Sequence, residues 1–547
     1  MVGAGERAEQ LLRDAQRAGG HPLNVVGVVD LLAADRGRTI RGAQIFGTID
    51  DLPSLAGQLH AELAVIALEP GSSPEMRRVV DQCIAAGLQF KTLAGVDGRV
   101  AANQLRDVRI EDLLERPPVS LDLSSVRGDL RNRVILLTGA AGSIGSELAR
   151  QIAPFGPARL VLLDQSESDL YFLHLELSEA HPGVELVPVI CDVTSQTRLA
   201  QVYAQHRPEY VIHAAAYKHV PLMESNVLEA VRNNVLGTLL VATNAARYGA
   251  AKLLLVSSDK AIRPSSVMGA TKRVAERIIF GLPNLHRTGT DFRAVRFGNV
   301  LGSRGSVIPL FERQLASGGP VTVTDPLVQR YFITIPEAAQ LVLQAGSLGE
   351  TAGAIAMLKM GEPLRILELA EKLIHCSGRV PGKDIQIVFT GLRPGEKLSE
   401  EQVSALEATI PTSTEQIRIS QTRESDGSEL VQRLSRLFAF LEAGDQDGVL
   451  VTLCELVPEC IPPLQRVRST PRASSGPRSG KAWEELVAPA ETTRDRKRAA
   501  PRMTELPELE LIDRRKGIVC RRKTPRIGGR RSADVAALLP TGTSPTD

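Results

Sequence analysis

The chain has 547 residues, of which 43% are hydrophobic, 23% are charged and 3% are aromatic, and its formal net charge is +2. This length is too great for one hydrophobic core and predicts about three globular units, and the composition excludes a wholly disordered or fibrous chain. So few aromatic residues argue against a base-stacking nucleic-acid surface in the body of the protein. No apolar run is long enough to cross a bilayer and no signal peptide is evident, so we expect a cytoplasmic protein.

The charges are divided unevenly along the chain. From Leu464 to Asp547 there are 19 Lys and Arg against 10 Asp and Glu, whereas the preceding residues carry 46 basic and 53 acidic groups. Pro, Arg, Ser and Gly dominate this last part, which therefore lacks the apolar surface needed to fold. We predict a disordered basic tail over residues 463–547, and the sequence does not identify its partner. The six cysteines form no CxxC pair, which favours free thiols in a reducing compartment.

The first region, residues 1–118, alternates short apolar runs with helical stretches. Asn24–Val29 and Leu63–Leu68 predict buried strands, and Pro74–Ala86 predicts a helix. A polar stretch that follows Pro117 and Pro118 predicts a linker over residues 119–131.

The start of this region carries a possible nucleotide-binding turn, Val2-Gly3-Ala4-Gly5, and Asp30 ends the following apolar run. A glycine-rich turn needs a preceding strand to aim it, and only Met1 and Val2 are present for that purpose. We therefore predict a degenerate Rossmann-like module of the CoA-binding kind without catalytic function. A real ligand site in this module stays open as the alternative.

The second region, residues 132–462, begins with a buried strand, Arg133–Thr138, and the glycines Gly139, Gly142 and Gly145 before a helical run. Three glycines at this spacing let the backbone turn tightly, approach a pyrophosphate and pack the helix on the strand. The helix N-terminus then offers free N–H groups to the phosphates. The sequence therefore predicts a dinucleotide-binding turn.

The next strands support this assignment. Asp164 ends the strand Leu160–Asp164, and an acidic side chain there accepts from ribose hydroxyls and repels a 2′-phosphate, which favours NAD over NADP. Further strands, Glu185–Ile190 and Tyr210–His213, lead into loops of small or acidic residues. The predicted NAD-binding residues in these strands and loops are Gly139, Gly142, Ser143, Ile144, Gly145, Asp164, Asp192, Val193, Ala214, Ala215 and Ala216.

Chemistry-bearing residues follow the fifth strand, Leu253–Val256. Ser257-Ser258-Asp259-Lys260 comes directly after it, and Met268-Gly-Ala-Thr-Lys272 opens the next helix. Together with Arg296–Gly305 and Gly391–Lys397, these segments resemble the extended short-chain dehydrogenases. Within them they resemble the nucleotide-sugar 4,6-dehydratases of bacterial polysaccharide biosynthesis, of the UDP-N-acetylglucosamine 4,6-dehydratase type. The resemblance covers about residues 1–462.

This resemblance implies an α/β chain in which an NAD-binding Rossmann fold carries a smaller C-terminal substrate-binding part. It implies conversion of a UDP-HexNAc such as UDP-N-acetylglucosamine to its 4-keto-6-deoxy sugar, and we expect a homo-oligomer. Large family members usually carry transmembrane helices ahead of the first module, and we do not expect such anchoring here. Ser399 stands where relatives often have Tyr, a difference without an evident catalytic consequence.

In this family the catalytic residues implied are Ser258, Asp259, Lys260, Met268 and Lys272. Asp259 is expected to be the general acid with a raised pKa, and Lys260 the base with a lowered pKa. Ser258 handles the 4-hydroxyl, and Lys272 holds the nicotinamide ribose. Most short-chain dehydrogenases place a Tyr base where this chain has Met268, but the dehydratase subgroup that it resembles also has Met there.

Basic and polar residues beyond these predict the substrate site, because guanidinium groups bind a diphosphate bidentately. The residues implied are Lys218, Glu224, Asn299, Arg304, Arg330 and Arg393. His213 and His219 have no ligand spacing, so no metal site is predicted.

Two other functions stay open. A UDP-sugar epimerase shares the cofactor, but it relies on a Tyr base and does not need an Asp-Lys pair. A catalytically inactive scaffold with a basic binding tail is the other alternative.

Overall fold

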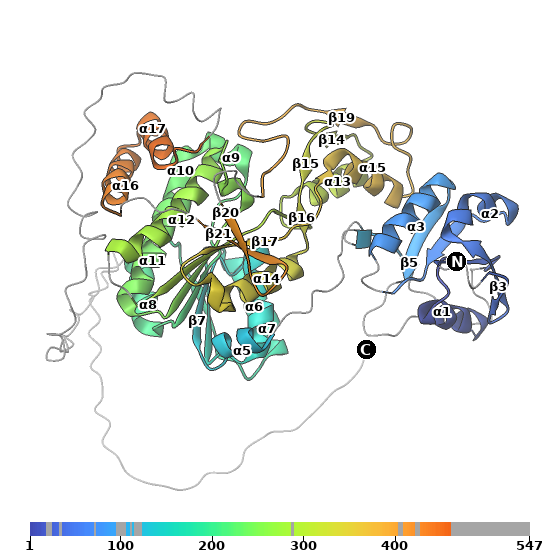
Figure 1. Ribbon diagram of the computed structural model, residues 1–547, viewed down its shortest axis with the longest axis horizontal. Helices are drawn as coiled ribbons and strands as arrows, with labels where there is room; N and C mark the ends of the chain where they lie inside the picture. Colours follow the sequence, from blue (N-terminus) through green and yellow to red (C-terminus); the bar gives the residue numbers. More distant parts are fainter. Residues whose placement is uncertain are drawn as a thin grey trace, which may run out of the picture. The chain divides into compact units, whose positions relative to one another are not determined.

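The computed structural model describes residues 1–17, 24–31, 36–69, 73–93, 105–109, 112–113, 123–285, 289–402, 408–421 and 427–460. The predicted tail, residues 463–547, and the first part of the predicted linker lie outside the described residues. The arrangement of the helices and strands is drawn in Figure 1.

The first module is built on parallel strands. Val2 bridges in parallel to Val29 on one side and to Ile66 on the other, and so joins two small sheets, β1-β3-β2 and β4-β5-β6. Val2 therefore pairs with both neighbours as an isolated bridge rather than as part of a strand. The strands of the module are β1 (Val28–Asp30), β2 (Thr39–Ile40), β3 (Ala43–Thr48), β4 (Leu63–Ile66), β5 (Gln89–Leu93) and β6 (Leu105–Asp107), and its helices include α1 (Glu6–Arg17), α2 (Leu52–Gln58) and α3 (Ser73–Ala85).

Helix α5 (Leu123–Leu130) occupies the second half of the stretch predicted as a linker. Val126 and Leu130 are each 1% exposed and belong to a hydrophobic cluster of the second module. They stand four residues apart and so share one face of the helix. The helix has only eight residues, most of them polar or Gly, and the linker prediction differs from the structure for that reason.

The second module contains a nine-stranded sheet with the order β20-β21-β17-β12-β11-β10-β7-β8-β9. The seven strands from β17 to β9 are parallel, and β21 and β20 continue the sheet antiparallel. The parallel strands are β7 (Val134–Thr138), β8 (Arg159–Asp164), β9 (Leu186–Ile190), β10 (Tyr210–His213), β11 (Lys252–Val256), β12 (Asp291–Arg296) and β17 (Ile355–Leu358); the antiparallel pair is β20 (Ala408–Pro411) and β21 (Ile417–Gln421).

Helices cover both faces of this sheet because its strand residues alternate between them. Ile135 and Leu137 of β7 face a cluster shared with α5, α6 (Ser143–Ile152), α7 (Glu167–Ala180) and α14 (Ile335–Ser347). Leu136 faces the opposite cluster, shared with α8 (Gln196–His206), α11 (Gly237–Tyr248) and α12 (Val267–Leu285). Beyond α12 lie α16 (Gly427–Glu442) and α17 (Gln446–Leu456) (Figure 1).

The order of the strands locates the crevice of the sheet. From β7 the chain proceeds outward to β8 and β9, and β10 then returns to the other side of β7. Ligands of open parallel sheets bind at such a reversal, outside the carboxyl ends of the strands. The ends of β7, β10 and β11 are therefore the expected place for the site.

The substrate part consists of three short strand pairs with two helices. They are β13 (Asn299–Val300) with β16 (Phe332–Ile333), β14 (Val321–Val323) with β19 (Ile387–Phe389), and β15 (Gln329–Arg330) with β18 (Leu364–Arg365), together with α13 (Val307–Ala316) and α15 (Ile366–Cys376). None of the helices described in the chain is both long and apolar enough to cross a membrane.

Candidate active site

The turn after β7 has no room for side chains. An ideal Cβ atom on Gly145 would lie 1.9 Å from the carbonyl oxygen of Gly139, and one on Gly139 would lie 2.5 Å from the amide nitrogen of Ala215. Gly139 also has a φ of 68°, in the left-handed region that favours glycine. The bare backbone and the N-terminus of α6 therefore form the cradle that a pyrophosphate needs.

Asp164 connects the end of β8 to this turn. One carboxylate oxygen accepts from the amide of Ala141 and the other from the amide of Ser166, both at 2.9 Å. The same contact occurs in the first module, where the amide of Ala4 donates to Asp30 at 2.9 Å. Asp164 lines a cavity of about 260 Å³ together with Asp192, Val193 and the loop Ala214–Ala216. The predicted adenosine-side residues are therefore brought together.

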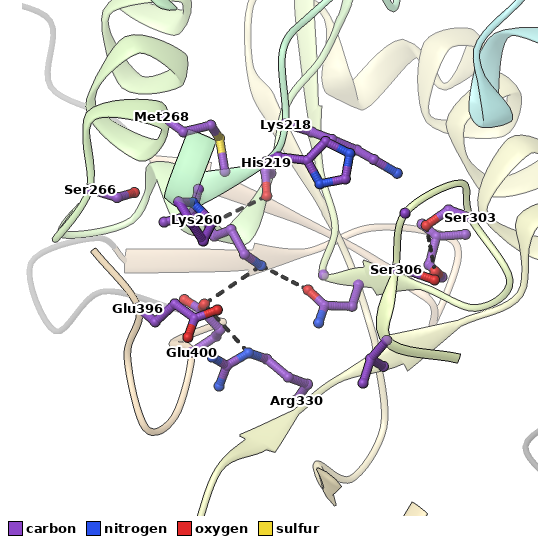
Figure 2. Close-up of a pocket in the computed structure, with 18 of the residues that line it drawn as sticks. Lys218, His219, Lys260, Ser266, Met268, Ser303, Ser306, Arg330, Glu396 and Glu400 are labelled. Atoms are coloured by element: carbon purple, nitrogen blue, oxygen red, sulfur yellow. Dashed lines mark hydrogen bonds and ion pairs between the residues drawn. The ribbon is translucent and has the colours of Figure 1, made fainter. Parts of the chain in front are cut away.

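A larger cavity, of about 950 Å³, lies over the carboxyl ends of β7, β10 and β11. Most of the predicted catalytic and substrate residues line it (Figure 2), namely Lys218, Ser258, Lys260, Met268, Lys272, Asn299, Arg304, Arg330 and Arg393. Gly142, Ser143 and Ile144 line its cofactor end. Asp259 and Glu224 are not among its lining residues.

Ser258, Asp259 and Lys260 form a hydrogen-bonded cluster at the end of β11. The Ser258 hydroxyl donates to Asp259 Oδ1 at 2.9 Å, and Lys260 Nζ donates to the same oxygen at 3.2 Å. Lys260 also donates to Asn299 Oδ1 at 2.8 Å. Asp259 is 5% exposed, and its Oδ2 has no hydrogen-bond partner among the described residues. A buried, half-satisfied carboxyl is an environment that favours the protonated form.

The charges in this cluster agree with one sequence prediction and contradict another. Burial raises the pKa of Asp259, and Lys260 offsets this only in part. Burial by itself lowers the pKa of Lys260, but the carboxylates of Asp259 and Glu400 outweigh burial and raise it. The prediction of a lowered pKa for Lys260 is therefore wrong. At neutral pH this side chain is an ammonium in the resting site.

Met268 and Lys272 lie one turn apart on α12, and both line the cavity. Met268 is 3% exposed and has no proton to exchange. Lys272 donates to the carbonyl oxygen of Val256 at 2.8 Å. Burial lowers the pKa of Lys272 to about 8, while the carboxylate of Glu276 acts in the opposite direction. Lys272 therefore keeps a positive charge at neutral pH, close to its titration.

A buried ionic network under this helix was not predicted from the sequence. Glu276, 1% exposed, accepts from the Ser257 hydroxyl at 2.6 Å and from two nitrogens of Arg296, each at 2.7 Å. Arg273 adds a further bond to the same carboxylate at 3.1 Å. The network joins α12 to the ends of β11 and β12 and so fixes the strand end that carries Ser258. The i, i+3 spacing of Arg273 and Glu276 on a predicted helix is the local signal for it.

Two predicted substrate residues, Glu224 and Arg330, form hydrogen bonds to the protein backbone. Glu224 accepts from the amide of Val267 at 2.7 Å, at the start of α12, and is not among the residues that line the cavity. Arg330 lines the cavity, but it donates to the carbonyl oxygens of Gln329, Lys397 and Leu398 at 2.7 to 3.0 Å. These backbone bonds direct its guanidinium group into the protein.

The other two arginines are exposed at the rim. Arg393 pairs with Glu396 through Nε at 3.0 Å. Arg304 pairs with Asp169 of α7 at 2.6 Å, and its amide donates to Ser143 at 3.2 Å. Arg304 thus connects the two sides of the cofactor crevice and lines both cavities.

His213 has a structural role in the described structure. Its two ring nitrogens contact the hydroxyls of Thr138 at 2.7 Å and Thr238 at 3.1 Å. Burial lowers the pKa of His213 to about 3, with a smaller contribution from Lys272, so it is neutral. Among the described residues, no three His, Cys, Asp or Glu side chains are grouped to hold a metal ion.

Glu400 and Glu396 are carboxylates of the cavity that sequence reasoning missed, and Glu400 is the one next to Lys260. It is 6% exposed, and its Oε1 lies 3.6 Å from Lys260 Nζ and 3.8 Å from Arg330 Nε. Figure 2 shows both cations directed at it. In the sequence, Glu400 and Glu401 come three and four residues after the segment Gly391–Lys397. Their position directly beyond this motif was the available signal for a site residue.

A parallel sheet with a glycine turn at its reversal point and an Asp-Lys pair at the end of β11 defines a Rossmann-fold protein of the extended short-chain dehydrogenase class. The chain matches the family model described as polysaccharide biosynthesis protein over residues 135–422, and it belongs to this family. The family resemblance predicted from the motifs is confirmed.

Individual relatives give more detail. The chain is 45% identical over 407 residues to the capsular polysaccharide biosynthesis protein CapD of Staphylococcus aureus, which covers 73% of this chain and 67% of the relative. It is 30% identical over 274 residues to a UDP-N-acetylglucosamine 4,6-dehydratase (inverting) of Campylobacter jejuni, with 50% of this chain and 77% of the relative covered. It is also 30% identical over 283 residues to a UDP-glucose 4-epimerase of Rickettsia rickettsii, with 50% of this chain and 79% of the relative covered.

Proposed function

We propose that the protein is an NAD-dependent 4,6-dehydratase of UDP-N-acetylglucosamine or a related UDP-HexNAc, acting in polysaccharide biosynthesis. The observation that carries the proposal is the combination of Asp259 and Lys260 at the end of β11 with Met268 on α12. Removal of water from a sugar needs an acid and a base such as this carboxyl and this amine, and a thioether occupies the position of the usual Tyr base. The family and the similarity to a dehydratase of Campylobacter jejuni support it.

The residues around the smaller cavity fit NAD. The side-chain-free turn at Gly139 and Gly145 suits a pyrophosphate, and each oxygen of Asp164 keeps a lone pair for a ribose hydroxyl. No basic residue occurs in Gln165–Ser168, and Arg304 at the cavity rim is paired with Asp169. We therefore propose NAD rather than NADP, and recovery of NADP from the denatured protein would contradict this.

The chemistry divides among few groups. Bound NAD supplies a hydride acceptor for sugar C4 and returns the same hydride at C6. In our proposal Ser258 relays the 4-hydroxyl proton to solvent, directly or through water, and Lys272 holds the nicotinamide ribose. Oxidation at C4 acidifies the C5 proton, and Lys260, which lines the cavity, takes that proton. General acid–base groups of this kind contribute about 10² to 10⁴-fold each.

Asp259 has a raised pKa, as a general acid requires, but it does not line the cavity. Its contacts are to Ser258 and Lys260. We propose that the protonated Asp259 positions these two side chains, in place of the predicted direct transfer to the departing 6-hydroxyl.

A UDP-sugar epimerase is the second candidate, supported by the similarity to a UDP-glucose 4-epimerase. Epimerisation at C4 removes and returns one hydride at the same carbon, so it needs no base at C5 and no acid at C6. Met268 at the usual Tyr position argues against it, because a thioether does not accept the hydroxyl proton.

Incubation of the purified chain with UDP-N-acetylglucosamine, followed by ¹H NMR, tests the proposal. We expect a new C6 methyl doublet and loss of the C6 hydroxymethylene signals. Accumulation of a C4 epimer with an intact hydroxymethylene group would establish the epimerase instead.

A further inference from the structure

Glu400 lines the proposed reaction cavity, and none of the steps proposed above uses it. It is 6% exposed, lines the cavity, and its Oε1 lies between the nitrogens of Lys260 and Arg330 at 3.6 and 3.8 Å (Figure 2). Asp259, the other carboxyl next to Lys260, lies behind it and does not line the cavity. Of these two carboxyls, Glu400 is therefore the one that faces a bound sugar.

The backbone holds Glu400 in this place. The amide of Gln329 donates to the carbonyl oxygen of Leu398 at 2.9 Å, and Arg330 donates to the carbonyl oxygens of Lys397 and Leu398 at 2.8 and 3.0 Å. These hydrogen bonds hold the segment that ends at Glu400 beside β15. A side chain held in this way offers a preorganised proton acceptor.

Burial and the neighbouring charges shift the pKa values of Glu400, Lys260 and Asp259 in different ways. Burial by itself raises the pKa of Glu400, but Lys260, Arg330 and Lys397 outweigh burial and lower it. Burial raises the pKa of Asp259, and the carboxylates of Asp259 and Glu400 raise the pKa of Lys260. Of the two carboxyls next to Lys260, Glu400 is therefore the one that gives up its proton more readily, and it lines the cavity. An ammonium cannot act as a base until it has lost a proton, so it needs such an acceptor.

We propose, on the basis of the dehydratase function above, that Glu400 is a third acid–base residue, which accepts the Lys260 proton and passes it to the departing 6-hydroxyl. It is a catalytic residue in this proposal because it touches the reacting oxygen.

The step balances within one turnover. A proton moves from Lys260 to Glu400, which leaves a neutral amine and a neutral carboxylic acid. The amine takes the proton from C5, the electron pair of the C5–H bond forms the C5=C6 double bond, and the C6–O bond breaks. Glu400 protonates the departing oxygen, which leaves as water. Elimination leaves Lys260 an ammonium and Glu400 a carboxylate. When the hydride returns to C6, the Lys260 ammonium supplies the proton that C5 takes up, and a proton from solvent then restores the ammonium for the next substrate.

The competing interpretation is that Glu400 only balances the charge of two buried cations. Both interpretations predict that loss of the carboxylate harms the site, so stability alone does not separate them. The pH profile does separate them, because a proton acceptor must be ionised before each turnover. The fall in kcat at acidic pH then reports the titration of Glu400.

The test compares Glu400→Gln with Glu401→Gln. Glu401 lies one residue further on, pairs with Arg263 at 3.4 Å and does not line the cavity. We expect Glu400→Gln to lower kcat by about 10² to 10⁴-fold, to slow exchange of the C5 proton with D₂O and to lose the acidic limb of the pH profile. Glu401→Gln should keep the wild-type profile, and Glu400→Asp should recover part of the rate. A folded Glu400→Gln protein with wild-type turnover, or with an unchanged acidic limb, would overturn the proposal.

A second measurement needs no sugar. Competitive labelling of Lys260 with acetic anhydride, followed by mass spectrometry over a range of pH, gives the pKa of this lysine in the substrate-free protein. We expect a lower pKa in Glu400→Gln than in the wild type and Glu401→Gln, and equal values in all three would overturn the proposal. If the wild type converts no UDP-HexNAc, the proposed function fails, and labelling still decides whether Glu400 holds the Lys260 proton.

Discussion

Replacing Glu276 by Gln tests the network that supports the catalytic strand end. Glu276 is 1% exposed, and its neighbours lower its pKa to about 2 from 4.5, because Arg296 and Arg273 outweigh the effect of burial. A shift of this size corresponds to about 3 kcal/mol of unfolding free energy at pH 7. Breaking a buried ion pair from one side costs about 3–5 kcal/mol, so both routes give the same magnitude.

The sign of the pH dependence follows from the lowered pKa. The carboxylate of Glu276 stabilises the folded state above its unfolded pKa, and this stabilisation is lost as the pH falls toward its folded pKa. We therefore expect Glu276→Gln to be about 3 kcal/mol less stable than wild type at pH 7, with a smaller difference near pH 3.

Urea unfolding of the full chain, followed by far-UV circular dichroism, measures this difference. Glu179→Gln is the matched control, because Glu179 is an exposed residue of α7 and should change stability by about 0.5 kcal/mol or less. A Glu276→Gln protein as stable as the control, or a difference that grows on acidification, would refute the reasoning.

Three further predictions concern the cofactor turn, the proton carriers and the tail. Gly145→Ala should purify without bound dinucleotide, because the new Cβ atom would lie 1.9 Å from the carbonyl oxygen of Gly139. The control Gly183→Ala, whose Cβ atom would have no neighbour within 4 Å, should keep the dinucleotide, and nucleotide analysis of the denatured proteins tests both expectations. Lys260→Ala should stop both dehydration and exchange of the C5 proton, whereas Met268→Ala should lower turnover only modestly in a coupled assay; equally deep losses would make the thioether more than a spacer. Removal of residues 464–547 should leave turnover unchanged, and a folded truncation without activity would give the tail a role in catalysis.

The parallel sheet and its cofactor turn were predictable because their signals are local. The strand before Gly139, the three glycines and Asp164 lie within one βαβ stretch, and the structure keeps their predicted order. Helix α5 was missed for the opposite reason. It spans only eight residues, LSSVRGDL, and so short a stretch gives little periodicity to detect in the sequence.

The electrostatics of the site were not predictable from local patterns. The expected pKa shift of Lys260 was wrong because two carboxylates together outweigh burial: that of its neighbour Asp259, and that of Glu400, which the pairing of its segment with β15 brings to 3.6 Å. Likewise, Glu224 has the right chemistry for a sugar contact, but the fold uses it at the first turn of α12. Residue type indicates what a side chain is able to do, and only the tertiary contacts fix which partner it has.

The most direct test of the account follows the hydride itself. UDP-N-acetylglucosamine labelled with deuterium at C4 should give a 4-keto-6-deoxy product with that deuterium in the C6 methyl group, measured by ²H NMR and mass spectrometry. Internal transfer of this kind requires one bound cofactor and elimination of water across C5 and C6. Deuterium that remains at C4 in an epimerised product, or a product without deuterium at C6, would contradict the account.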